Sequence, residues 1–307
     1  MKNIFTYSTA FVLGLALLAT PEAEAQQFSK RKQYNSVGFS LNALNYFGDI
    51  TPVTSFASFR FGATRAGAGI TISRRFYPRL SGRFGLSYGR ISGDDTKAAD
   101  PNDPDARYRY NRNFAFRNDI IELSGVAVFD LIENRNNYLK RPDFVPYLFG
   151  GFAVFHHNPK GLVQDNVLPE YTDLRKGSYV SLANVRTEGQ DKAYSQFQIA
   201  IPIGGGVRYR INRSFDASLE IGWRKTFTDY IDDVGGKFAE GNKLNTNAQK
   251  YFGRDITLDR TDTGPFPGFT TPGESRGDRG RKTDWYITTS ATLSYILTPR
   301  IKNPKFR

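Results

Sequence analysis

Residues 196–211 read QFQIAIPIGGGVRYRI, and this stretch decides the fold class. Every second position is apolar or glycine, whereas the positions between them carry Gln, Ala, Pro, Gly and Arg. A period of two places alternate side chains on opposite faces of a β-strand. The stretch therefore predicts a long strand with one apolar face and one small or polar face.

The same alternation recurs along the chain. It is clear again at 215–227, after a very tight turn, and at 285–297. With five weaker runs the sequence predicts eight strands, each long enough to cross a bilayer at the tilt of a barrel. Eight strands make the smallest closed barrel expected in an outer membrane. The weaker runs are 37–46, 66–76, 80–91, 116–131 and 144–156.

The connections between these runs alternate between short and long. Short periplasmic turns and long extracellular loops are typical of transmembrane β-barrels, so both chain ends are expected on the periplasmic side. We therefore predict an all-β protein, an eight-stranded antiparallel transmembrane β-barrel. The short connections lie near 77–78, 133–143 and 212–214, and the long loops lie near 51–64, 93–113, 158–194 and 230–282.

Composition narrows the class of protein. The 307 residues include no Cys, which excludes a disulfide framework, Cys-ligated zinc or iron–sulfur sites and a Cys nucleophile. Hydrophobic residues make up 39% and the mean hydropathy is −0.48, which argues against a bundle of membrane helices. A membrane β-barrel remains compatible, because only every second strand residue meets lipid.

The first 25 residues have the features of a secretory signal. Lys2 precedes an apolar core at 11–19, and Ala23-Glu24-Ala25 forms a small-x-small cleavage site. We expect cleavage before Gln26, so that 26–307 form a single outer-membrane barrel domain. Nucleic acid is a poor candidate partner, because the signal directs the chain out of the cytoplasm.

A soluble lipocalin-like barrel is the structural rival, because alternation alone does not say which stripe faces outward. Two features favour the membrane barrel. The polar stripe is dominated by Gly, Ser and Thr, which suits a narrow lumen, and the apolar stripe carries aromatic residues near strand ends, which resemble interfacial girdles. These residues are Tyr46, Phe76, Phe116, Phe155, Tyr209, Trp223, Phe227, Trp285 and Tyr295.

Charged residues on the inward stripes predict a closed lumen. Glu122, Arg208, Glu220 and Arg224 are candidates for a salt-bridged plug, because buried charges must be paired. A lumen of eight strands fills with side chains, so we expect structural filling and no free conduction of solutes.

Three motifs suggest chemistry only weakly. The chain's two histidines, His156 and His157, sit at the external end of a strand, where some small barrels are hydrolases or acyltransferases, but no nucleophile motif accompanies them. Asp229, Asp232 and Asp233 lack the order of a calcium loop, so a solvated loop is favoured over a cation site. Gly204-Gly205-Gly206 lies inside a strand and allows bending or close packing. We predict no enzyme activity, cofactor, metal or small-molecule substrate.

Basic residues gather at the predicted periplasmic rim, whereas most acids lie in the long loops. Two interpretations are open, contact with anionic phospholipid headgroups or docking to a periplasmic partner with complementary charge. The docking candidates are Arg74, Arg75, Arg79, Arg135, Lys140, Arg141, Arg213, Arg300 and Lys302.

A set of short motifs occurs in a fixed order along the strands. Together they resemble the PorG-like outer-membrane barrels of the Bacteroidota type IX secretion system, from about Asn45 to Tyr295; most of the loop 235–281 has no counterpart. The motifs are NYFGDI at 45–50, ISGDD at 91–95, RNFAFRNDIIEL at 112–123, PYLFGGFAVFHHNPK at 146–160, RTEGQ at 186–190, IPIGGG at 201–206 and WRKTFTDYIDDV at 223–234.

The resemblance implies a non-enzymatic outer-membrane barrel that anchors or assembles a periplasmic ring, made of a lipoprotein and a partner protein. Cargo would pass through a separate, larger translocon. The alternative is a general small barrel for adhesion or envelope integrity that acts through its external loops. A rim hydrolase centred on His156 and His157 is a third hypothesis.

Overall fold

The computed structural model describes residues 32–50, 61–100, 102–103, 107–163, 175, 177–239, 243, 275–277 and 283–297. The predicted signal peptide at 1–25 and most of the loop 230–282 lie outside these residues. Within the described part of the chain, no helix is both long and apolar enough to span a membrane.

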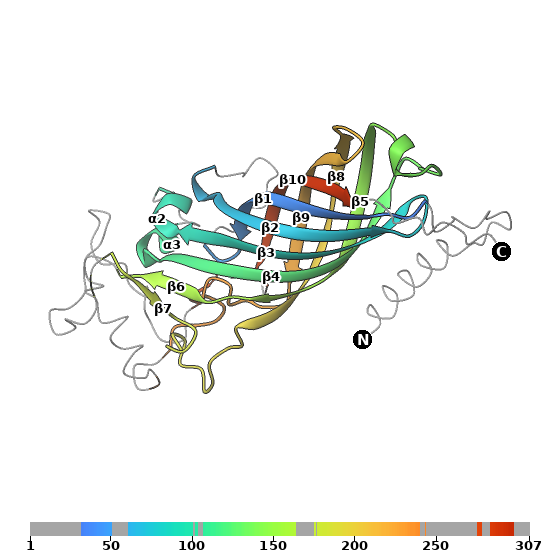
Figure 1. Ribbon diagram of the computed structural model, residues 1–307. Helices are drawn as coiled ribbons and strands as arrows, with labels where there is room; N and C mark the ends of the chain where they lie inside the picture. The colour runs from blue at the N-terminus through green and yellow to red at the C-terminus, as the bar shows by residue number, and fades with distance from the viewer. Residues whose placement is uncertain are drawn as a thin grey trace, which may run out of the picture.

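Eight antiparallel strands form a closed barrel, which confirms the predicted fold class (Figure 1). Each strand pairs with its neighbours in the wall, β1 pairs with β10, and β3 pairs with β4 to complete the circle. The barrel strands are β1 (Asn35–Phe47), β2 (Arg65–Arg75), β3 (Leu80–Asp94), β4 (Ala115–Asp130), β5 (Phe144–His156), β8 (Phe197–Arg210), β9 (Phe215–Thr226) and β10 (Trp285–Leu297).

The two ends of the barrel differ, as the loop lengths predict. We call one the turn end; it holds the short connections 76–79, 131–143 and 211–214. Asn35 at the start of β1 pairs with Leu297 at the end of β10, so both of these strand termini also lie at the turn end. We call the opposite end, which carries the longer connections, the loop end.

The loop end contains more regular structure than the predicted loops. β3 continues to Asp94, and β6 (Pro159–Leu162) and β7 (Tyr179–Ser181) extend the sheet beside the external part of β4 (Figure 1). This happens because β4 runs beyond the end of β5, which leaves its edge free to pair with β6. The short elements are η1 (Phe61–Ala63), α2 (Asp95–Ala98), α3 (Arg107–Arg112) and, at the turn end, η2 (Tyr138–Lys140).

The outer wall is apolar and the lumen near the turn end is polar. Phe39, Phe84 and Phe152 on three different strands are 54%, 71% and 71% exposed. Large apolar side chains this exposed, on all eight strands, form a continuous band of the kind that faces lipid in barrels. The apolar stripe of 196–211 lies on this wall, as predicted.

Part of the predicted aromatic girdle is wrong. Tyr46, Phe116 and Phe155 are no more than 3% exposed and pack inside the barrel toward the loop end. They occupy inward positions of β1, β4 and β5, so the strand alternation turns them away from the wall. Trp223 and Trp285 are half-buried. The exposed members, consistent with a girdle, are Phe76, Tyr209, Phe227 and Tyr295.

The glycines of the 201–206 motif make room inside the barrel. A Cβ on Gly204 would lie 2.7 Å from Cζ of Phe149 and would clash with the carbonyl oxygen of Ile221. Gly222 faces the same ring, since its Cβ would lie 2.8 Å from Phe149 Cζ. The motif therefore allows a large aromatic ring into a narrow lumen, which confirms the close-packing interpretation.

Candidate functional site: the lumen and the turn end

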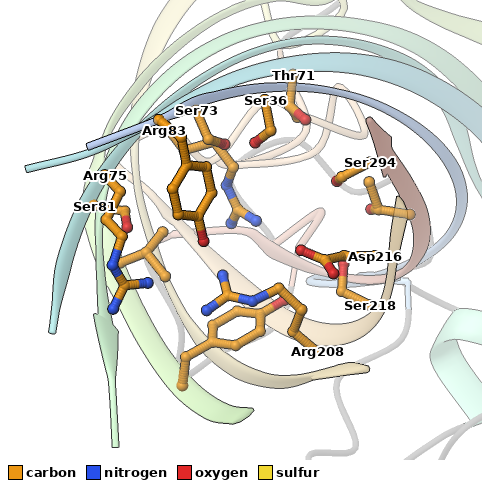
Figure 2. A pocket seen from close by; sticks show the side chains of 14 residues that line it. Ser36, Thr71, Ser73, Arg75, Ser81, Arg83, Arg208, Asp216, Ser218 and Ser294 are labelled. Atoms are coloured by element: carbon orange, nitrogen blue, oxygen red, sulfur yellow. The ribbon is translucent and has the colours of Figure 1, made fainter. Parts of the chain in front are cut away.

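A polar chamber occupies the lumen toward the turn end (Figure 2). Arg83 and Arg208 reach into it from opposite walls, while small hydroxyl side chains line its surface. Small inward residues leave the space that the long arginines fill. The hydroxyl residues shown are Ser36, Thr71, Ser73, Ser81, Ser218 and Ser294.

The four lumen residues predicted from sequence all point inward, but only two of them pair with each other. Arg224 Nε lies 3.4 Å from Glu122 Oε2, and Glu122 also accepts a 2.7 Å hydrogen bond from Tyr286. Glu220 pairs with Arg83 at 2.7 Å, which the sequence reasoning missed. The strand alternation indicated that these charged side chains lie on inward stripes, but it does not indicate which of them form ion pairs.

Asp130 is a buried anion beside this chamber, where it contacts two of the arginines that line it. Its Oδ2 accepts from Arg75 Nη1 at 2.9 Å and from Arg208 Nη2 at 2.7 Å, and the carboxylate is 1% exposed. Arg75 also donates to the carbonyl of Pro78. One buried carboxylate thus joins β2, β4 and β8 where the strands reach the turn end.

Arg141 forms a second buried contact across the turn end. Its Nε and Nη2 donate to Asp216 Oδ1 at 3.0 and 2.7 Å, and it donates to the carbonyls of Tyr138, Asn212 and Arg213. A guanidinium so fully coordinated fixes the connection between β4 and β5 onto the turn between β8 and β9.

These contacts correct the predicted docking set. Arg75 and Arg141 are 3% and 4% exposed, so their charges are neutralised inside the protein and are not presented to a partner. Arg300 and Lys302 lie outside the described residues. The five candidates that the structure leaves exposed are Arg74, Arg79, Arg135, Lys140 and Arg213.

The exposed cations form the turn-end basic rim, a name we keep for these five residues. Arg135 is 73% exposed and pairs with Glu133 at 2.9 Å, Arg79 donates to the carbonyl of Leu131, and Arg74 lies 5.6 Å from the ring of Phe76. The acids Asp130 and Asp216 are buried against other arginines, so they do not neutralise the positive charge of the rim.

Among the described residues, buried side chains from the strands and connections pack together at the loop end. Tyr46, Phe116 and Phe155 pack against Leu182 and Ile231 from two connections, and all five are buried. This apolar packing fills the barrel toward the loop end, above the polar chamber. The absence of free conduction stays a prediction.

Ion pairs hold the same packed region together. Arg112 donates from Nε and Nη2 to the two oxygens of Asp95, both at 2.7 Å, and both residues are buried. Arg276 donates to Asp233 Oδ2 at 3.2 Å and contacts Glu188 Oε1 at 3.3 Å. Asp95 and Arg112 lie in the same connection, whereas the Arg276–Glu188 pair joins the last connection to the one between β5 and β8. Arg112 also donates to the backbone oxygens of Asp49 and Arg276, so contacts of Arg112 and Arg276 together link four connections at the loop end.

The acidic cluster at 229–233 is not a solvated loop, which corrects the sequence interpretation. Asp232 and Asp233 are fully buried, and Tyr46 donates to Asp232 Oδ2 at 2.6 Å. Burial, reinforced by the charges of Asp49 and Glu188, raises the pKa of Asp229 to about 7. The reason for the difference is tertiary, because β1, β10 and the final connection converge on these carboxylates.

Three carboxylates at this place have the spacing of possible metal ligands. Asp49, Asp229 and Asp284 each place one oxygen within 4.8 Å of the others. Asp284 also accepts from Tyr46 at 3.1 Å and from the backbone amide of Ile231 at 3.0 Å. Both carboxylate oxygens of Asp284 therefore already accept hydrogen bonds from the protein.

The two histidines differ in environment. His157 is fully buried, stacks on Tyr194, and places Nε2 3.2 Å from the carbonyl oxygen of Ser195. Burial lowers the pKa of His157 to about 4. His156 is half-buried and lies against Phe197 on the wall. The described contacts of His157 are those of a packing residue, and the absence of enzyme activity stays a prediction.

A family model described as a domain of unknown function (DUF6089) matches residues 23–178. The chain belongs to this family. The match runs from β1 through β6 and covers four of the five residues in the turn-end basic rim, all except Arg213. A comparison with curated proteins gives no match.

Solved structures similar to this chain include three bacterial proteins. Neisserial surface protein A is 11% identical, with 85% of this chain and 96% of that chain covered and a TM-score of 0.38. The outer membrane protein OprG from Pseudomonas aeruginosa is 7% identical, with 88% and 98% covered and a TM-score of 0.40. Ail, the attachment invasion locus protein of Yersinia pestis, is 9% identical, with 86% and 97% covered and a TM-score of 0.35.

Proposed function

We propose that this chain is an outer-membrane component of the type IX protein secretion system. In this role it anchors or assembles the periplasmic ring at the outer membrane, with its turn end toward the periplasm. The apolar outer wall supports the membrane location, because an apolar band that surrounds the whole barrel is the surface that outer-membrane barrels present to lipid. The ordered motifs from 45–50 to 223–234, which resemble those of PorG-like barrels, support the assignment to this secretion system.

The turn-end basic rim carries the docking part of the proposal. The folded barrel buries Arg75 and Arg141 against acids but leaves five other cations exposed at the same end, of which Arg135 pairs with Glu133. Exposed charges of one sign steer and orient a partner of opposite charge. The proposed partners are the ring lipoprotein and its companion protein, through an acidic surface.

Charge reversal of Arg135 and Lys140 tests this proposal. Both lie on the exposed connection between β4 and β5, so Arg135→Glu with Lys140→Glu leaves the buried Arg141–Asp216 contact intact. We expect about tenfold less ring protein to co-purify in mild detergent, equivalent to about 1.4 kcal/mol. The barrel itself should still fold, as judged by its heat-modifiable band on a gel.

A matched control reverses the same amount of charge at the other end of the barrel. Lys97 and Lys192 are exposed at the loop end, and Lys97→Glu with Lys192→Glu should leave ring association unchanged. If the rim variant keeps its ring partners, the docking proposal fails, and the basic rim serves anionic headgroups of the inner leaflet instead.

A second candidate function is adhesion or envelope integrity through the loop end. The observation that favours it is the packing at the loop end, which gives the external connections a rigid base. Lys237 and Ser275 form an isolated β-bridge that brings the two sides of the last loop together. Replacing 244–274 by a short Gly-Ser linker therefore spares Arg276; lost surface binding with intact secretion would favour the adhesin.

A further inference from the structure

Three cations lie together on the outer wall, toward the loop end. Arg117 on β4 is directly opposite Lys160 on β6, and Arg90 on β3 is opposite Asp119 on β4. Arg117 and Asp119 continue the outward stripe of β4 that includes the exposed Ile121. Directly opposed residues share a face of the sheet, so all these side chains are on the wall side. We call Arg90, Arg117 and Lys160 the outer-wall cation cluster.

The cluster lies where the apolar wall ends. Tyr88, one outward step from Arg90 toward the turn end, is 49% exposed and donates to Asp119 Oδ1 at 3.0 Å. Leu86 and Leu123 follow in the same direction and are 47% and 61% exposed. A tyrosine with its ring among apolar residues and its hydroxyl on a charged group is typical of a membrane–water interface. The cluster is thus at the level of lipid headgroups.

Positive charge exceeds negative charge at this place. Asp119 engages Arg90 at 2.6 Å and also interacts electrostatically with Lys160, and Asp94, further along β3, engages Lys97 at 3.0 Å. The three cations of the cluster therefore share one nearby acid, Asp119. Arg117 and Lys160 face each other across the β4–β6 pair, and no ion pair between either of them and an acid is recorded among the described residues. Like charges directly opposite each other in a sheet destabilise it, unless an anion lies between them.

Arg117 is held in place for such an anion. Its guanidinium lies 4.0 Å from the centroid of the Tyr179 ring on β7, which fixes its plane. Its Nε is buried and has no hydrogen-bond acceptor among the described residues. An oriented guanidinium beside a lysine is the arrangement that binds phosphate oxygens, since the fork of donors matches the phosphate and the ammonium adds charge.

We propose that the outer-wall cation cluster binds a phosphate of the glycolipid in the outer leaflet of the outer membrane. Arg117 and Lys160 contact the phosphate, Arg90 adds to the field, and the acyl chains lie along the apolar wall below Tyr88. Continuity with this wall favours a lipid over a soluble anion. The inference goes beyond the proposed function and shares with it only the location in the outer membrane.

Binding of lipid A to the purified full-length protein in detergent tests the proposal, with native mass spectrometry as the readout. Arg117→Gln with Lys160→Gln should weaken binding of bisphosphorylated lipid A about tenfold or more. Wild-type protein should bind lipid A stripped of its phosphates as weakly as this variant binds the intact lipid. Lys192→Gln with Lys225→Gln removes the same charge from exposed positions elsewhere and should bind like wild type.

Three results would overturn the proposal. These are equal binding by the double Gln variant, equal binding of dephosphorylated lipid, and complete displacement by excess inorganic phosphate, which would indicate a soluble anion site. The ring-docking variant Arg135→Glu with Lys140→Glu should keep its lipid. Because ring proteins are absent from this experiment, failure of lipid binding and failure of ring docking are distinguishable.

Discussion

Asp130 should contribute more to barrel stability than any exposed acid at the turn end. The change Asp130→Asn keeps the shape of the side chain but removes the negative charge that Arg75 and Arg208 share at 2.9 and 2.7 Å. Arg75 is 3% exposed and Arg208 is 22% exposed, so water compensates only the second. Removing one partner of a buried ion pair costs about 3–5 kcal/mol.

Because Arg208 is partly solvated, we expect the lower limit, about 3 kcal/mol. For a slope of about 1–3 kcal/mol per molar urea, this shifts the unfolding midpoint down by about 1–3 M. The chain has two tryptophans, Trp223 on β9 and Trp285 on β10. Their fluorescence in detergent micelles therefore reports unfolding of the barrel wall directly.

A double-mutant cycle separates the ion pair from general damage. Arg208→Gln in the Asp130→Asn background should cost less than in the wild type, with a coupling of at least about 1 kcal/mol. Asp143→Asn is the control, because Asp143 is 68% exposed beside Arg210 and should contribute less than about 1 kcal/mol. Equal midpoint shifts for Asp130→Asn and Asp143→Asn, or no coupling in the cycle, would refute the reasoning.

The other predictions concern the glycine motif, the half-buried Asp229 and the buried His157. Gly204→Ala pushes a Cβ toward Phe149 and the adjacent backbone, so it should cost about 1–3 kcal/mol and reduce the heat-modifiable folded band; an unchanged band would contradict the packing. The raised pKa of Asp229, about 7 against about 3.9 when unfolded, means that the folded state binds more protons in this window. Loop-end stability should therefore fall as pH rises from about 4 to about 7, and Asp229→Asn should flatten that trend in limited proteolysis. His157, with its pKa lowered to about 4, should stay neutral and show no titration by NMR between about pH 7 and pH 5, a range in which an unperturbed imidazole would charge. Its contribution to stability is present above about pH 6.5 and is lost as pH falls toward about 4.

Much of the barrel wall follows from local pattern. The alternation at 196–211 divides the side chains of β8 between two faces, and it does so whatever the partner strands are. The composition of the two faces then indicates which of them is the outer one. Runs joined by short turns become antiparallel neighbours, so strand number, order and the two unlike ends of the barrel follow as well. Glu122 and Arg224 could be recognised as lumen residues because each lies on an inward stripe.

Which charged groups meet depends on the tertiary structure. Asp130 contacts Arg75 and Arg208, which are 55 and 78 positions away along the chain. The register of the closed barrel, summed over several strands, sets these contacts, and no local pattern contains it. The same limit applies to Arg141, which lies in a connection, whereas the alternation of β2 already places Arg75 on the inward stripe with Thr71 and Ser73.

The ends of the strands show most clearly where local sequence pattern no longer predicts the environment of a side chain. Tyr46 and Phe116 were interpreted as interfacial aromatics, yet they occupy inward positions of β1 and β4 and are packed there by connections from elsewhere in the chain. Asp232 reads as a solvated loop acid, yet those same connections bury it. The sequence by itself determined the wall, because the phase of a strand is local. Only the tertiary structure decided which lumen charges form ion pairs, which cations of the rim are exposed and which cations form the outer-wall cluster. Burial and charge pairing arise when distant segments converge.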